Sequence, residues 1–156
     1  MAVNIKQTTW NIQVLLNFCI VKKKKISFRS DCPIGKTLDI LGDKWSLLIV
    51  RDLVFKGKNT YGAFLNGGEG ITTSVLADKL ALLEGGGIIS KEVHPDSKAK
   101  ILYRLTQKGI DLIPVLVEVI AWSEKYHEVH PQATAFAKQL KRDKESVIKM
   151  LRESLK

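Results

Sequence analysis

The fold is decided by residues 70–105, GITTSVLADKLALLEGGGIISKEVHPDSKAKILYRL. Thr72 is a residue type that favours a helix N-cap, and the three glycines at 85–87 are typical of a helix end. Between them, one apolar side chain per turn predicts a buried face made of Leu76, Leu80 and Leu83. The stretch therefore predicts an amphipathic helix that runs from Thr72 to about Glu84.

The second half of this stretch changes its periodicity from helix to strand. Ile101, Tyr103 and Leu105 alternate with other residues, which is typical of a half-buried strand. Residues 88–93 are a second candidate strand, and the segment 94–99 joins it to the strand over 100–105. We therefore expect a β-hairpin directly after the helix.

Three further helices are expected before this stretch. The first begins at Pro33, where the missing N–H costs nothing, and its predicted buried stripe is Ile34, Leu38, Ile40 and Leu41. Asp43 is expected to cap the second helix, over 44–53. The third is a short helix over 61–65, and the glycine-rich segment 66–70 after it predicts a tight turn.

Two more helices are expected after the hairpin. Thr106 caps the first of them, Pro114 is expected to kink it, and its apolar residues are Leu112, Ile113, Leu116, Val117, Ile120 and Trp122. The second is a single amphipathic helix marked by Phe136, Leu140, Val147, Leu151 and Leu155. The apolar surplus predicted to face a second copy of the chain is Leu112, Leu116, Ile120, Phe136, Leu140, Val147 and Leu151.

This order of elements is that of a winged helix-turn-helix domain, in which the second helix of the motif enters the major groove of DNA. We predict a mainly α-helical fold with a small β-hairpin, extended by C-terminal dimerisation helices. The predicted parts are an N-terminal extension over 1–26, the winged helix-turn-helix domain over 27–127 and a C-terminal amphipathic helix over 128–156.

Several short motifs between Asp31 and Trp122 together resemble the HxlR family of winged-helix transcription regulators. They are Cys32-Pro33, Thr37-Leu38-Asp39, Gly42-Asp43-Lys44-Trp45, Leu47-Leu48-Ile49, Arg51-Asp52-Leu53, Gly70-Ile71-Thr72 and Tyr103-x-Leu105-Thr106. The resemblance implies a sequence-specific DNA-binding transcription regulator. With the apolar surplus described above, we predict a homodimer whose two recognition helices address half-sites about 34 Å apart.

Seven residues are candidate DNA contacts. The N-terminal end of the 72–84 helix offers hydroxyls and free backbone N–H groups to phosphates or base edges, and the predicted wing adds two lysines. The full set is Thr60, Thr72, Thr73, Ser74, Ala77, Lys98 and Lys100.

The motif itself carries little positive charge, which departs from the family. Uncharged residues stand where the family often has Arg or Lys, namely Asn59, Thr60, Ser74 and Ala81, and Asp78 would repel phosphates. Phosphate contacts supply most non-specific affinity for DNA. We expect them from Lys56 and Lys58, from the two wing lysines or from the ends of the chain.

The net charge of +9 is concentrated in those ends. Residues 1–31 carry +5, residues 32–127 carry +1 and residues 128–156 carry +3. A basic balance favours a polyanionic partner, and solvated basic tails are its plainer explanation.

The first 26 residues hold a short apolar stretch, 10–21, which ends at four lysines. It is shorter than the roughly 20 residues that span a bilayer, and its charges follow the apolar part, the reverse of a secretory signal. Three interpretations stay open: an added element on a dimer surface, a membrane-surface segment, or translated upstream sequence with the true start near Val21.

Cys32 is the candidate sensor thiol. It lies at a helix start with Lys36 one turn later, both of which favour a thiolate, while Asp31 opposes them. The resemblance to HxlR-type regulators implies sensing of quinones, aldehydes or oxidants, and a packed structural cysteine is the alternative. Cys19 is a possible resolving thiol.

No catalysis, cofactor or metal site is expected. No serine or cysteine comes with a plausible histidine and carboxylate, and the pair His127 and His130 beside Glu124 is a weak metal motif.

Trp45 and Trp122 are expected in the core, and the Arg51-Asp52 pair is expected to be structural. Two cysteines without a C-x-x-C pair are too few for a secreted disulfide scaffold, so we expect a reducing cytoplasm as the setting. The alternative function is a protein-interaction or scaffold module on a winged-helix frame without specific DNA binding.

Overall fold

The computed structural model describes residues 26–95 and 97–155, so the apolar stretch 10–21 and Cys19 lie outside the described residues. Its elements follow the chain in the order α2 (Pro33–Leu41), α3 (Ser46–Phe55), α4 (Tyr61–Leu65), α5 (Thr73–Gly85), β1 (Ile89–His94), β2 (Ser97–Leu105), α6 (Gln107–Ile110), α7 (Ile113–Tyr126), α8 (Pro131–Arg142) and α9 (Lys144–Glu153). The predicted mainly α-helical fold with a β-hairpin is confirmed.

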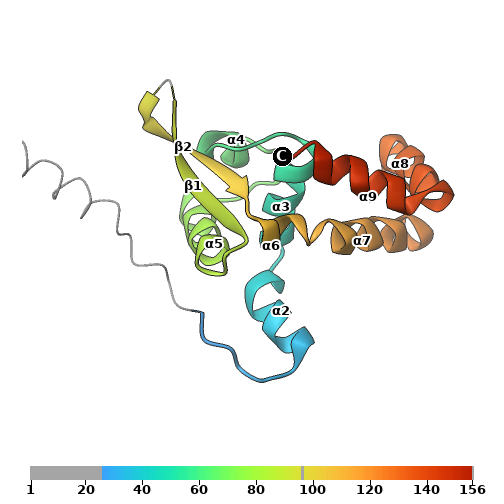
Figure 1. Ribbon diagram of the computed structural model, residues 1–156, viewed down its shortest axis with the longest axis horizontal. Helices are drawn as coiled ribbons and strands as arrows, with labels where there is room; N and C mark the ends of the chain where they lie inside the picture. Colours follow the sequence, from blue (N-terminus) through green and yellow to red (C-terminus); the bar gives the residue numbers. More distant parts are fainter. Residues whose placement is uncertain (1–25, 96, 156) are drawn as a thin grey trace, which may run out of the picture.

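The helix-turn-helix and its wing form one side of the molecule, and α7, α8 and α9 extend to the other side (Figure 1). The strands β1 and β2 pair antiparallel, with Ile89 opposite Leu105 and Val93 opposite Ile101. Thr60 forms an isolated bridge with Leu102, and the Tyr103 N–H donates to the Asn59 carbonyl oxygen at 2.7 Å. These bonds join the start of α4 to the hairpin.

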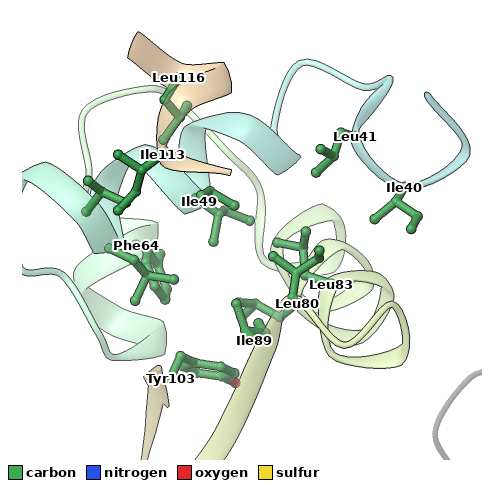
Figure 2. Packing of buried hydrophobic residues seen from close by; sticks show 14 of the residues in the cluster. Ile40, Leu41, Ile49, Phe64, Leu80, Leu83, Ile89, Tyr103, Ile113 and Leu116 are labelled. Carbon is green, nitrogen blue, oxygen red and sulfur yellow. The ribbon is translucent and has the colours of Figure 1, made fainter. Parts of the chain in front are cut away.

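The core lies where α3, α5, α7 and the hairpin meet. Leu76, Leu80 and Leu83 of α5 are buried, as the spacing predicts. They belong to one apolar cluster with Ile49 of α3, Phe64 of α4, Ile89 and Tyr103 of the hairpin and Ile113 and Leu116 of α7 (Figure 2). Burial of one face of α5 fixes which residues its other face presents to solvent.

The chain after the hairpin differs from the prediction in two ways. Pro114 does not kink a continuous helix, because the chain breaks between α6 and α7 and Pro114 occupies the first turn of α7. The single helix predicted over 128–156 is two helices. Asp143 separates them with an extended backbone (φ −155°, ψ 82°), and its carboxylate accepts from the Ser146 N–H at 3.0 Å to cap α9.

The two C-terminal helices fold back onto α7, so most of the apolar surplus predicted to face a second copy packs inside the chain. Leu116, Leu140, Val147 and Leu151 are buried in the same core, and Phe136 packs edge-on against Phe55 of α3. That predicted interface is therefore wrong in its residues.

Other apolar side chains are exposed instead. Ile34 and Leu38 of α2 are 71% and 51% exposed, so only Ile40 and Leu41 of the predicted stripe are buried. Trp122 is 60% exposed and lies outside the core, contrary to the prediction, whereas Trp45 does pack against the core. Over the described residues, no helix is both long and apolar enough to cross a membrane.

Candidate nucleic-acid interface

The N-terminal end of α5 is exposed on the side of the molecule that also carries the hairpin (Figure 1). Thr72 is the N-cap residue, as predicted, but its hydroxyl makes no capping hydrogen bond and lies 3.5 Å from the Ser74 hydroxyl instead. The first backbone N–H groups of α5 are therefore not satisfied by a side chain of the cap residue. The exposed face begins with Thr72, Thr73, Ser74 and Ala77.

Tyr61 links the two helices of the motif. Its hydroxyl, on α4, donates to the Thr73 carbonyl oxygen at 2.7 Å, at the first turn of α5. The bond fixes the start of α5 relative to α4. Nothing in the sequence pattern marks this function of Tyr61 beyond the presence of a tyrosine in the first turn of the short helix.

Thr60 has a structural function as well as a place at the surface. Its hydroxyl accepts from the Ala63 N–H at 3.3 Å and so caps α4. It also lines a groove of about 640 Å³ between α4 and the hairpin, together with Tyr61, Gly62, Ala63, His94, Lys100, Ile101 and Tyr103. The structure thus brings two predicted contacts, Thr60 and Lys100, to one groove.

The wing is the hairpin of β1 and β2, and it carries the two lysines that are predicted DNA contacts. Lys100 is exposed on β2, and Lys98 lies in the same strand, where only its backbone is described. The neighbouring cations of the hairpin are paired: Arg104 with Glu92 at 2.6 Å, and Lys91 with Glu84 at 2.5 Å. Lys100 is therefore the wing cation whose described environment best suits a phosphate contact.

Lys56 and Lys58 are not free to compensate for the weakly charged motif. Both pair with the carboxylate of Asp52, at 3.5 Å and 3.2 Å, and Arg51 binds the same carboxylate at 2.5 Å. On α5 itself, Lys79 pairs with Asp43 at 3.1 Å. The expectation that Lys56 and Lys58 supply phosphate contacts therefore conflicts with their positions.

Asp52 is 4% exposed, and we call Arg51, Asp52, Lys56, Lys58 and Glu69 the Asp52 cluster. Burial alone would raise the pKa of the Asp52 carboxyl, but hydrogen bonds from Arg51 and Lys58 and the charges of Arg51 and Lys56 outweigh it and lower the pKa. Asp52 is thus an ionised, fully partnered group, in keeping with the predicted structural role of the Arg51-Asp52 pair.

Cys32 is the N-cap residue of α2, as expected, and its side chain is exposed. Asp31 and Lys36 form an ion pair at 2.8 Å, so the positive neighbour expected to favour a thiolate is neutralised beside it. The thiol is accessible to reagents and makes no cap hydrogen bond.

The weak metal motif is not assembled among the described residues. The His127 ring contacts the Trp122 ring at a tilt of 56°, with centroids 5.4 Å apart, and the His130 ring nitrogen Nδ1 accepts from the Gln132 N–H at 3.3 Å. No group of three or more His, Cys, Asp or Glu side chains that could hold a metal ion occurs in the part of the chain that the structure describes.

Residues 40–131 match the family model of the HxlR-like helix-turn-helix proteins. A relative in Synechocystis sp., the HTH-type transcriptional regulator sll1512, is 40% identical over 86 residues, which span 55% of this chain and 63% of its own length, a little under two thirds. The HTH-type transcriptional regulator YdeP of Bacillus subtilis is 35% identical over 111 residues, which span 69% of this chain and 86% of YdeP.

Solved structures agree with these matches. The crystal structure of PA1607, a candidate transcription factor, superimposes with a TM-score of 0.58 at 37% identity, over 66% of this chain and 70% of that one. The redox regulator HypR in its oxidised form superimposes with a TM-score of 0.55 at 31% identity, over 63% of this chain and 100% of HypR.

Proposed function

Because the chain belongs to the HxlR-like helix-turn-helix family of transcriptional regulators, we propose that it binds operator DNA as a homodimer through α5 and the wing. The chain is a DNA-binding transcription regulator and not an enzyme.

One observation carries the DNA-contact proposal: the buried face of α5 turns Thr73, Ser74 and Ala77 outward beside an exposed wing. In this arrangement the start of α5 enters the major groove, where hydroxyls read base edges, and Lys98 and Lys100 meet the backbone. Thr72 adds a hydroxyl at the helix start. Thr60, from its capping position, lines the protein groove between α4 and the hairpin next to Lys100.

The test is fluorescence anisotropy with a labelled duplex from the chain's own promoter region, at several salt concentrations. We expect affinity to fall steeply with salt, and Ser74→Ala to change base preference in a footprint while Ser123→Ala, the same change on α7, leaves it unchanged. Binding without salt dependence or sequence preference would contradict the proposal and favour the scaffold module, which the paired cations of the motif make a reasonable second candidate.

The proposed dimer interface is the exposed apolar face of α7 together with the exposed side chains Ile34 and Leu38 of α2. Val115, Val119, Trp122 and Tyr126 recur at spacings of four, three and four residues, which align them on one side of a helix. Residues 128–155 brace this helix from behind through α8 and α9. Two copies joined here would present two α5 helices to half-sites about 34 Å apart.

The proposed signal is an electrophile that reacts at Cys32. Conjugate addition of the thiol to a quinone forms one S–C bond and moves the thiol hydrogen to the quinone, which becomes a substituted hydroquinone. The adduct would add bulk beside α2, next to the proposed interface. The likeness to HypR, whose name states a redox regulator, supports this assignment.

The sensor is tested by titrating DNA binding with benzoquinone, methylglyoxal and diamide in the wild type, Cys32→Ser and Cys19→Ser. We expect a response of the wild type that Cys32→Ser abolishes. A response that survives Cys32→Ser would refute the assignment. A free, exposed thiol of this kind suits the reducing cytoplasm, which we propose as the location of the protein.

A further inference from the structure

The turn between α4 and α5, residues 66–72, is held by two side chains of the Asp52 cluster. Arg51 Nη1 binds Glu69 Oε1 at 2.8 Å, and Lys58 Nζ donates to the Gly67 carbonyl oxygen at 3.3 Å. We call these two bonds the turn contacts. Both cations also bind the buried Asp52 carboxylate, so the turn is tied to the core through one group.

The backbone of this turn depends on glycine at two positions. Gly68 and Gly70 adopt φ of +86° and +73°, a region that glycine enters without a steric penalty. Glu69 stands between them and is the charged side chain of the turn. A glycine-rich segment loses more entropy on ordering than other sequences do, so contacts from outside the turn must restrict it.

The cluster lies directly against the turn at Gly67. A Cβ atom at this position would stand 3.1 Å from Lys58 Nζ and 3.3 Å from Asp52 Oδ2, and 2.8 Å from the Phe64 carbonyl oxygen. There is no room for a side chain between the turn and the cluster. The close approach is thus built into the sequence at Gly67 as well as at the charged residues.

We propose that Arg51 and Lys58 are positioning residues that set the sequence specificity of DNA binding through the turn contacts, without touching DNA. This rests on the proposed DNA-binding function of α5. Contacts to phosphates tolerate a range of helix orientations, whereas hydrogen bonds to base edges have narrow limits of distance and angle. Loosening the turn therefore weakens binding to a preferred sequence more than binding to an unrelated one.

Tyr61 and Ile71 do not replace the turn contacts. The Tyr61 hydroxyl holds the first turn of α5, and Ile71 is buried in the core at the end of the turn. Both act after Gly70, at the end of the turn and the start of α5. The segment 67–69, which leads the chain away from α4, is held by the turn contacts.

The experiment begins with selection by the full-length wild type from a pool of duplexes with a randomised centre. The specificity ratio is the Kd for a scrambled duplex divided by the Kd for the selected duplex, and it is measured for two pairs of variants. Lys58→Met removes a turn contact, while Lys56→Met removes an equal charge that also pairs with Asp52 but does not reach the turn. Glu69→Gln is matched by Glu145→Gln, an exposed residue of α9.

We expect the ratio to fall roughly three- to tenfold in Lys58→Met and Glu69→Gln, a range ordinary for residues that act on a binding site from a distance, and to stay within about twofold of wild type in the two controls. Equal ratios within each pair would overturn the inference. Glu69 is exposed, so Glu69→Gln answers the question even if Lys58→Met unfolds the chain. A wild type that enriches no sequence would instead overturn the proposed DNA-binding function.

Discussion

Asp52 shows how one buried carboxylate organises several surface cations. The pKa of its carboxyl is lowered, so the stabilisation that it supplies is present above its unfolded value of 3.8 and is lost as the pH falls through the lower folded-state value. We predict that Asp52→Asn lowers the free energy of unfolding by about 2–3 kcal/mol at neutral pH, because it leaves charges at the core without their partner. In urea titrations the gap between wild type and variant should close below pH 3.8. A gap that stays constant down to pH 2 would contradict this account.

Two glycines make a matched pair for packing. A Cβ atom at Gly109 would stand 2.2 Å from the Ile88 carbonyl oxygen, which accepts from the Thr106 N–H, whereas a Cβ atom at Gly62 has nothing within 4 Å. We predict that Gly109→Ala destabilises the protein by about 2–3 kcal/mol and that Gly62→Ala stabilises it by about 0.5–1 kcal/mol, since a helical glycine is replaced by alanine. Chemical denaturation of both variants checks this. Similar effects of the same sign would show that the Ile88 contact does not matter.

The residues that sequence alone could not assign are those whose partners are distant in the chain. Lys56, Lys58 and Lys100 are the same residue type, so the sequence does not distinguish them. Only the three-dimensional structure shows that the first two bind Asp52 and that Lys100 is exposed on the wing. Hydrogen bonds such as that of Tyr61 to Thr73 likewise have no periodic signal. Local chemistry predicts part of the capping: Thr106 caps α6, and the Asp43 carboxylate accepts from the first N–H groups of α3. The third predicted cap, Thr72, is the N-cap residue of α5 but forms no capping hydrogen bond.

At the scale of elements, the wing gives the clearest prediction. Exposed Lys100 and its strand neighbour Lys98 are proposed to meet phosphates, each of which contributes about 0.9 to the slope of log K against log salt. The variant Lys98→Ala with Lys100→Ala should lower that slope by about one to two units and weaken binding to all sequences alike, as measured by anisotropy. Lys149→Ala, an exposed lysine of α9, serves as the control. An unchanged slope would mean that the hairpin does not act as a wing.

Most helices and strands could be predicted from the sequence. The wrong predictions arose where apolar periodicity was the only signal used. Helix order, the hairpin and the buried face of α5 follow from periodicity and turn residues. The single C-terminal helix was wrong because its apolar spacing continues across Asp143, although Asp143 followed by Ser146 is a cap signal in the sequence. The exposure of Ile34, Leu38 and Trp122 has the same origin: periodicity identifies an apolar face but not what covers it.

At the scale of the whole molecule, the exposed face of α7 predicts assembly. Val119→Glu places a charge in the middle of that face and should raise the dimer dissociation constant by at least about tenfold, because a desolvated charge opposes association. Met150→Glu makes the same change at an exposed residue of α9 and should leave it unchanged. Sedimentation equilibrium at micromolar concentrations measures both. A monomeric wild type would remove the two-half-site arrangement.

The attachment of α2 has a kinetic consequence. Only its last residues, Ile40 and Leu41, are buried, while its first turns project from the body of the chain with Ile34 and Leu38 exposed (Figure 1). A helix held at one end opens by local unfolding at little cost in free energy. Backbone amides in its first turns should therefore exchange with deuterium far faster than those of α5 in dilute protein, and more slowly as concentration rises and a second copy covers them. For the same reason, the half-life of the Cys32 thiol toward an alkylating reagent should lengthen with protein concentration. The reactivity of this one thiol would then depend both on the amount of electrophile and on the amount of the protein itself.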